Sequence, residues 1–177
     1  TDKNDIVAKS RININLGLNY TELKDYLKAL FYYKEALELT KKNGNIRNRI
    51  TALNNIGTSY VSLGYFRKGL EYLEIGLNLA QEHNMQSDVA YLKFFIAKAY
   101  NEHKFIRKAM LFAEQSSTIA DSLKIMELML DNYSLLGNIY KKLNDHKSCN
   151  KVLRKLIQTK EAIQNEYYQK QLSEMEA

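Results

Sequence analysis

The residues that could serve as nucleophiles, general bases or metal ligands are few in this chain of 177 residues. There is a single cysteine, Cys149, and the three histidines are His83, His103 and His146. The histidines fall in polar surroundings, and no pair of them has the spacing of a metal-ligand motif. The sequence therefore predicts no metal site and no cofactor.

Carboxylates and glycines lack catalytic patterns as well. Glutamates three residues apart, as in Glu35–Glu38 and Glu71–Glu74, share one face of a helix, and we expect that face to be solvated. Gly44 and Gly64 stand alone, so neither belongs to a phosphate-binding loop. We therefore predict that this chain is not an enzyme, although a kinase output domain could follow it in a longer protein.

The composition points to helices as the elements that position these residues. The chain contains no proline and only seven glycines, and 45% of its residues are apolar. No stretch approaches the roughly 18 uncharged apolar residues needed to span a membrane. Because the sequence starts at Thr1 without methionine, we interpret it as a piece of a longer protein.

A pattern with a constant period runs through the chain. Small residues recur at equal spacing: Gly17, Gly57, Ala97 and Gly137. Each follows an apolar residue and precedes by three positions a tyrosine: Tyr20, Tyr60, Tyr100 and Tyr140. A second small residue follows each of them at a fixed offset: Ala29, Gly69, Ala109 and Cys149. Cys149 is therefore interpreted as a buried packing residue rather than a reactive thiolate.

This period predicts four stacked helix pairs in a single domain over residues 1–177. The units are expected at about 10–49, 50–89, 90–129 and 130–160, followed by a C-terminal helix at about 161–177. A glycine inside a helix is unfavourable by roughly 1 kcal/mol relative to alanine. Gly57 is explained if it lets the second helix of its unit approach closely, with the tyrosine filling the wider gap beside it.

The pattern resembles the tetratricopeptide repeat, and the unit with Leu16, Gly17, Tyr20, Ala29 and Tyr33 matches it best. The resemblance implies an all-α, right-handed superhelical solenoid that binds proteins or peptides. The unit of about 40 residues is longer than the usual one of about 34, and the proline that usually ends a repeat is absent. We therefore expect both helices of each unit to be about one turn longer.

Two segments resemble a narrower group, the N-terminal repeat regions of Bacteroidetes-type sensor histidine kinases and transcriptional regulators. They are ALNNIG at residues 52–57 and KEAIQNEYYQKQLSE at residues 160–174. This resemblance implies a sensing or regulatory region of a bacterial signal-transduction protein. The alternative is a free-standing scaffold or adaptor for complex assembly. The repeats would be periplasmic if a transmembrane helix follows Ala177, and cytoplasmic otherwise.

In such arrays the first helix of each unit lines a concave groove that binds a partner. The repeat phase places eleven candidate binding residues there: Arg11, Ile14, Leu18, Asn54, Asn55, Thr58, Tyr91, Phe94, Lys98, Asn138 and Lys141. Amide side chains can pair with both the donors and the acceptors of a peptide backbone, and aromatic rings can anchor an apolar side chain. The alternative is that the asparagines cap or bridge helices and the aromatic residues only pack between repeats.

Charge is concentrated near the C-terminus. Residues 131–160 carry seven lysines and arginines against two aspartates. We interpret this surface as solvated or as a docking site for an acidic partner, and we do not expect nucleic-acid binding, because interleaved exposed aromatic residues are lacking.

Tyr168, Leu172 and Met175 form an apolar stripe that either caps the solenoid or allows self-association of the C-terminal helix.

Overall fold

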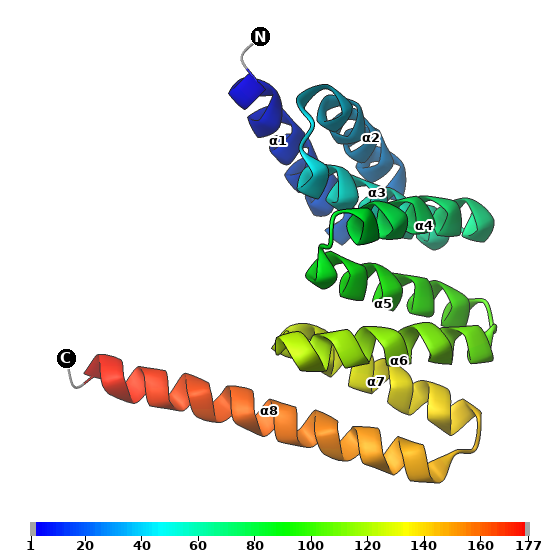
Figure 1. Ribbon diagram of the computed structural model, residues 1–177, viewed down its shortest axis with the longest axis vertical. Helices are drawn as coiled ribbons and strands as arrows, with labels where there is room; N and C mark the ends of the chain where they lie inside the picture. Colours follow the sequence, from blue (N-terminus) through cyan, green and yellow to red (C-terminus); the bar gives the residue numbers. More distant parts are fainter. Residues whose placement is uncertain (1–2, 176–177) are drawn as a thin grey trace.

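The protein is an all-α array of helices in a computed structural model, which is described here over residues 3–175 (Figure 1). Within these residues there is no strand, and the helices follow one another in a curved stack. They are α1 (Lys3–Glu22), α2 (Tyr26–Asn43), α3 (Ile46–Ser62), α4 (Phe66–Glu82), α5 (Gln86–Glu102), α6 (Ile106–Leu123), α7 (Met126–Lys142) and α8 (His146–Met175).

The helix boundaries repeat with the period of the sequence. The second helices of the four pairs begin at equal intervals, at Tyr26, Phe66, Ile106 and His146. The first helices from the second pair onward begin at the same interval, at Ile46, Gln86 and Met126. The period seen in the small residues and tyrosines is therefore the period of the three-dimensional unit.

The turns between helices share one backbone conformation. Each contains a residue in the left-handed region, with φ between 54° and 85°: Lys24, Gly44, Gly64, Asn84, Lys104, Lys124 and Asn144. Within each pair, the carbonyl of the periodic tyrosine accepts a hydrogen bond of 2.9–3.0 Å from the amide five residues later. This closure satisfies carbonyls at the helix end and fixes the angle between the two helices.

The first helices of the pairs form the inner wall of the curved array. The backbones of α1, α3, α5 and α7 approach one another in sequence, whereas no two of the second helices described here come equally close. Neighbouring units are therefore closest along the first helices and diverge along the second ones. The concave face is consequently built from α1, α3, α5 and α7.

The helices of the second pair cross at glycines. A Cβ atom added at Gly57 would lie 2.7 Å from Leu73 Cγ and 2.9 Å from the carbonyl oxygen of Gly69. One added at Gly69 would lie 2.7 Å from the carbonyl oxygen of Gly57. The backbones of α3 and α4 are thus in direct contact here, as the periodic small residues predict.

The contact between neighbouring units changes character along the array. Between the second and third units it is apolar, with Leu92 packed over Gly76. Between the third and fourth units it is a buried polar network, in which Asn132 Nδ2 donates to Ser116 Oγ at 2.9 Å. Ser116 Oγ in turn donates to the carbonyl of Ala90 at 2.8 Å, so the hydroxyl is satisfied both as donor and as acceptor.

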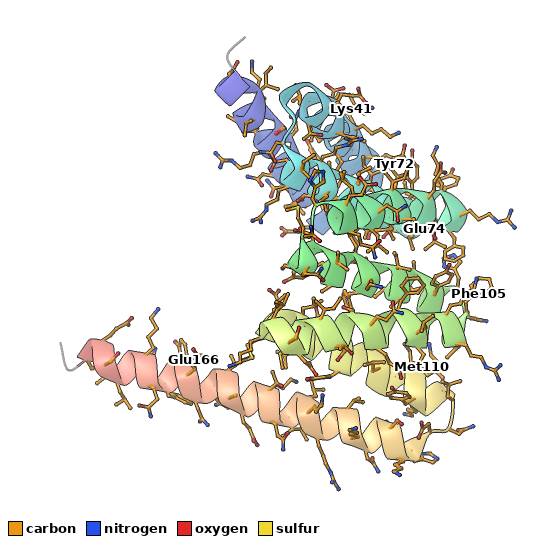
Figure 2. The ribbon with its side chains drawn as sticks, viewed as in Figure 1. Lys41, Tyr72, Glu74, Phe105, Met110 and Glu166 are labelled. Atoms are coloured by element: carbon orange, nitrogen blue, oxygen red, sulfur yellow. The ribbon has the colours of Figure 1, made fainter. Side chains whose placement is uncertain are left out.

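The C-terminal segment differs from the expected separate helix. Residues 161–175 continue α8 without a break, and α8 extends past the rest of the array, where Glu166 is labelled (Figure 2). Tyr168, Leu172 and Met175 are exposed by 52%, 50% and 82%. This part of α8 therefore does not cover the core of the last unit in the structure. Residues 176 and 177 lie outside the described part.

We expect Gly57→Ala to lower the free energy of unfolding. Overpacking typically destabilises by about 1–3 kcal/mol, which exceeds the gain of roughly 1 kcal/mol in helix propensity. Gly137→Ala is the matched control at the same repeat position, because its nearest contact is the mobile end of Leu153 at 3.4 Å. Thermal unfolding should show a lower Tm only for Gly57→Ala, and equal effects of the two substitutions would contradict this account.

Lys104→Gly should stabilise the fold. Lys104 has φ of 63°, a conformation that is unfavourable by about 1 kcal/mol for residues with a side chain. The converse substitution, Gly64→Ala, changes the same position in the preceding unit, where φ is 85° and a Cβ would meet nothing within 4 Å. Chemical denaturation should show opposite shifts of the midpoint for the two variants; shifts in the same direction would argue against backbone conformation as the cause.

Candidate functional site

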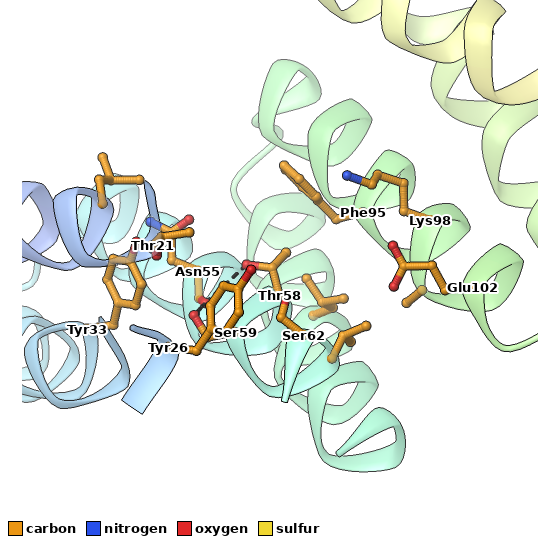
Figure 3. A pocket seen from close by; sticks show the side chains of 14 residues that line it. Thr21, Tyr26, Tyr33, Asn55, Thr58, Ser59, Ser62, Phe95, Lys98 and Glu102 are labelled. Carbon is orange, nitrogen blue, oxygen red and sulfur yellow. Dashed lines mark hydrogen bonds between the residues drawn. The ribbon is translucent and has the colours of Figure 1, made fainter. Parts of the chain in front are cut away.

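A pocket of about 310 Å³ opens on the concave side of the first three units. Figure 3 shows Phe95, Lys98 and Glu102 of α5 on one side, Thr21, Tyr26 and Tyr33 on the other, and residues of α3 between them. Its lining consists of Leu18, Thr21, Tyr26, Tyr33, Asn55, Thr58, Ser59, Val61, Ser62, Leu73, Phe95, Lys98, Ala99 and Glu102. The pocket is therefore amphipathic, with apolar, neutral polar and two charged side chains.

The wall formed by the first unit is fixed by the close approach of its helices. A side chain at Gly17 would overlap the ring of Tyr33, so only glycine admits the ring at this place. The hydroxyls of Tyr33 and Thr21 lie 2.9 Å apart in a hydrogen bond, and Thr21 Oγ1 also donates to the carbonyl of Gly17 at 3.0 Å. Burial raises the pKa of Tyr33, and the bond to Thr21 opposes that shift.

Four of the eleven predicted groove residues line this pocket: Leu18, Asn55, Thr58 and Lys98. The pocket also contains Tyr26, Ser62, Phe95 and Glu102, which are absent from the predicted set. Two of these residues, Ser62 and Glu102, could have been predicted from the sequence. Counting one helical turn onward from Thr58 and Lys98 leads to Ser62 and Glu102 on the same faces of α3 and α5.

The prediction that Ile14 and Phe94 face the groove is wrong. Both are buried in the helix packing, with exposures of 5% and 7%. Asn54 has the same repeat position and is half-buried, with an Oδ1 atom that is enclosed and lacks a hydrogen-bond partner. At this repeat position the residues of α1, α3 and α5 are therefore buried or half-buried, and on α5 the next residue, Phe95, lines the pocket instead.

The remaining four predicted residues lie on the first helices but outside the pocket. Arg11 on α1 and Asn138 and Lys141 on α7 are exposed. Tyr91 on α5 is half-buried, and its pKa is raised by burial and by the carboxylates Glu127 and Asp131. The structure thus brings Leu18, Asn55, Thr58 and Lys98 together in one pocket. It leaves the other four residues at separate positions outside that pocket.

The groups considered for catalysis remain dispersed. His103 stacks on Phe66 with ring centres 4.0 Å apart, and Cys149 is half-buried with its Sγ 3.5 Å from the carbonyl oxygen of Gly137. In the part of the chain that the structure describes, no group of three histidines, cysteines or carboxylates is placed to hold a metal ion. No helix in that part is long and apolar enough to cross a membrane.

Family comparison agrees with the geometry of the helix pairs. A family model described as Tetratricopeptide repeat matches residues 10–43 and again residues 130–163, which fall in the first and fourth units. The first and fourth units thus match the tetratricopeptide repeat. This confirms the all-α repeat fold expected from the sequence.

Curated relatives of these repeats come from distant organisms. The outer dynein arm-docking complex subunit 4 of Danio rerio is 26% identical over 147 residues, which are 83% of this chain and 29% of that protein. The response regulator aspartate phosphatase A of Bacillus subtilis is 27% identical over 136 residues, which are 73% of this chain and 34% of that protein. The chain thus spans about a third of the curated relatives it matches.

Solved structures show the same repeat architecture. Aspartyl phosphate phosphatase F from Bacillus subtilis superposes with a TM-score of 0.85 over 92% of this chain and 42% of that one, at 13% identity. Two of the three similar proteins are thus named as phosphatases. Because the match covers less than half of either phosphatase, and the structural likeness shows the fold alone, their activity is not carried over to these repeats.

The carboxylate of Asp131 on α7 should make the stability of the fold depend on pH. Partial burial and Glu127 raise the pKa of Asp131, against the opposing charge of Lys98. The ionised form is therefore less favourable in the folded state than in the unfolded state. We expect Asp131→Asn to raise Tm at pH 7, with the difference vanishing as pH falls through the raised pKa.

Asp145 is the matched control with the opposite sign. Hydrogen bonds from Ser148 hold the pKa of Asp145 below its ordinary value, so its ionised form stabilises the start of α8. Asp145→Asn should lower Tm at pH 7, and the deficit should close as pH falls through the lowered pKa. Thermal unfolding at pH values from 7 to 2 gives both curves, and differences of the same sign at pH 7 would refute the assignment.

Proposed function

We propose that this chain is a non-catalytic module that binds a protein or peptide in its concave groove. We further propose that it is the sensing or regulatory region of a larger bacterial signal-transduction protein, such as a histidine kinase or a transcriptional regulator. The observation that supports binding is the amphipathic pocket between α1, α3 and α5, on the face where neighbouring units approach most closely.

The pocket has the chemistry for an extended peptide. The side chain of Asn55 lines it and offers two donors and an acceptor, which match the alternating groups of a peptide backbone. Leu18, Val61 and Phe95 supply apolar surface for one anchoring side chain. Lys98 and Glu102 lie one turn apart on α5 at its edge, so both signs of charge are available to orient the ligand (Figure 3).

The signalling role is supported by the long α8. Residues 146–175 form one uninterrupted helix that begins in the fourth repeat and extends beyond the array. A rigid helix anchored in the repeats can carry a change in their curvature to a segment that follows it. A bacterial relative is named response regulator aspartate phosphatase A, and this name indicates that similar repeats occur in a regulatory protein. A free-standing scaffold would use the same groove without this output.

Selection from a phage-displayed library of random dodecapeptides tests the groove directly. Peptides enriched on the chain should bind at least tenfold more weakly to Phe95→Ala and to Asn55→Ala, because truncation of a hot-spot residue typically costs about 2 kcal/mol or more. Leu27→Ala is the control, since Leu27 lies on α2 with 71% exposure and outside the pocket. Isothermal titration gives the affinities.

Circular dichroism should show that all three variants keep the fold. Failure to enrich any peptide, or equal affinity for the Phe95 and Leu27 variants, would remove the groove as the binding site.

The signalling role has a separate readout in the natural full-length protein, where the enriched peptide should change output activity in the wild type and not in Asn55→Ala. Binding without any change in output would favour the scaffold.

A further inference from the structure

The fourth unit exposes apolar side chains at repeat positions that the other units bury. Two positions of the second helix are at most 9% exposed wherever another unit follows: Tyr33, Leu73 and Ala113 at the first, and Leu37, Leu77 and Ser117 at the second. Their equivalents in α8 are Leu153 and Ile157, which are exposed by 40% and 56%. The array therefore ends, within residues 3–175, in an apolar surface of the kind that a neighbouring unit covers elsewhere.

α8 continues as a helix where the repeat period would place a turn to a fifth unit. The residues in the left-handed conformation between units are Gly44, Asn84 and Lys124, and the next position of this series is 164. Gln164 lies inside α8, which runs without interruption to Met175 and extends beyond the array (Figure 1). Because the helix does not break, its second half cannot fold back to cover Leu153 and Ile157.

The second half of α8 carries a further apolar patch on the same side of the helix. Tyr168, Leu172 and Met175 are each exposed by half or more. Successive residues of an α-helix are about 100° apart, so these three residues and the pair Leu153 and Ile157 fall within one arc of about 100°. A single face of α8 thus holds two exposed apolar patches, with residue 164 midway between them.

The two halves of α8 also differ in charge. Residues 146–160 contain five lysines and arginines and no carboxylate, whereas residues 161–175 contain three glutamates and one lysine. Lys155 pairs with Asp121 of α6 at 2.8 Å, and the other cationic side chains of the first half are exposed. Two such helices that run in opposite directions place unlike charges side by side, and two that run in the same direction place like charges together.

We propose that two copies of this chain associate through antiparallel α8 helices, so that each copy covers the open end of the other. Leu153 of one copy lies opposite Met175 of the second copy, and Ile157 lies opposite Leu172. The contact is two-fold symmetric and is centred on Gln164, where the two amide side chains can pair as donor and acceptor. This arrangement covers both apolar patches of both helices.

Charge and geometry favour the antiparallel pair over a parallel one. A parallel pair would bring the basic first halves of the two helices together, and these would repel each other. It would also leave each apolar patch against its own equivalent, without bringing the second half of α8 to the open end of the other array. The contact is independent of the concave pocket, which contains no residue of α8.

Light scattering coupled to size-exclusion chromatography tests the association. The 177-residue chain should change from monomer to dimer as its concentration rises, and high salt should weaken the dimer because it screens the unlike charges. Ile157→Asp and Leu172→Asp should each weaken dimerisation at least tenfold, because each substitution occurs twice in a symmetric contact and places a charge in an apolar surface. Leu27→Asp is the control, since Leu27 is 71% exposed and lies on α2. Circular dichroism should show that all three variants keep the fold.

Cysteine crosslinking determines the direction of the helices. The background is Cys149→Ala, because alanine occupies the same repeat position in the first and third units. A short bismaleimide should join a Leu153→Cys chain to a Met175→Cys chain in an equimolar mixture. Neither variant should crosslink to itself, because equivalent residues at these positions lie about 33 Å apart across the centre of an antiparallel pair. Gln164→Cys should crosslink to itself.

Three results would overturn the proposal. Self-crosslinking of Leu153→Cys would show a parallel pair. Equal dimerisation of Ile157→Asp and Leu27→Asp would show that another surface joins the copies. A monomer at every concentration up to about 1 mM, the weak end of specific affinities, would show that a second copy does not cover α8.

Discussion

The close contact of two helices within each unit is the constraint on which the array depends. At Gly57 and Gly69 the backbones of α3 and α4 touch, and neither position has room for a Cβ atom. A helix pair of this kind buries one face internally and leaves another apolar face open, so that each pair is stable only when the next one covers it. The distance between helices in a unit is set at these small residues, and the stacking of units follows from it.

The stacking of the units curves the array, and this curvature produces the concave face that contains the pocket. Neighbouring units meet closely along α1, α3, α5 and α7 and diverge along the second helices, which gives a concave inner face and an outer face with grooves. On the inner face, side chains such as those of Thr58 and Lys98 line the pocket. In three units a stacked ring pair also joins the first helix to the second helix.

The sequence was sufficient for the parts of the fold that repeat. Four recurrences of a small residue and a tyrosine locate every helix pair, because packing imposes the same demand at each unit. The orientation of single side chains is harder to predict from the sequence. Phe94 and Phe95 are adjacent, equally apolar and about 100° apart on α5. Only the position of the neighbouring helix decides that Phe94 is buried and that Phe95 lines the pocket. The continuity of α8 past residue 160 could have been predicted, because both halves read as helix and no residue between them marks a break.

Residues that depart from the repeat pattern make contacts that occur in one unit only. Ser116 departs from the small residues at its position and is explained within the fold, because its hydroxyl joins Asn132 to the carbonyl of Ala90. Val152 and Ser148 depart together from an aromatic residue and a lysine at the same positions of the other units, yet Tyr140 is 8% exposed and therefore as buried as Tyr60 at 6% and Tyr100 at 9%. A substitution that is compensated inside the protein serves folding. The same holds in the fourth unit, where Val152 packs in one core cluster with Tyr140 and the tyrosine hydroxyl donates to Glu114 at 2.6 Å, so neither a second ring nor a lysine is needed to bury the periodic tyrosine.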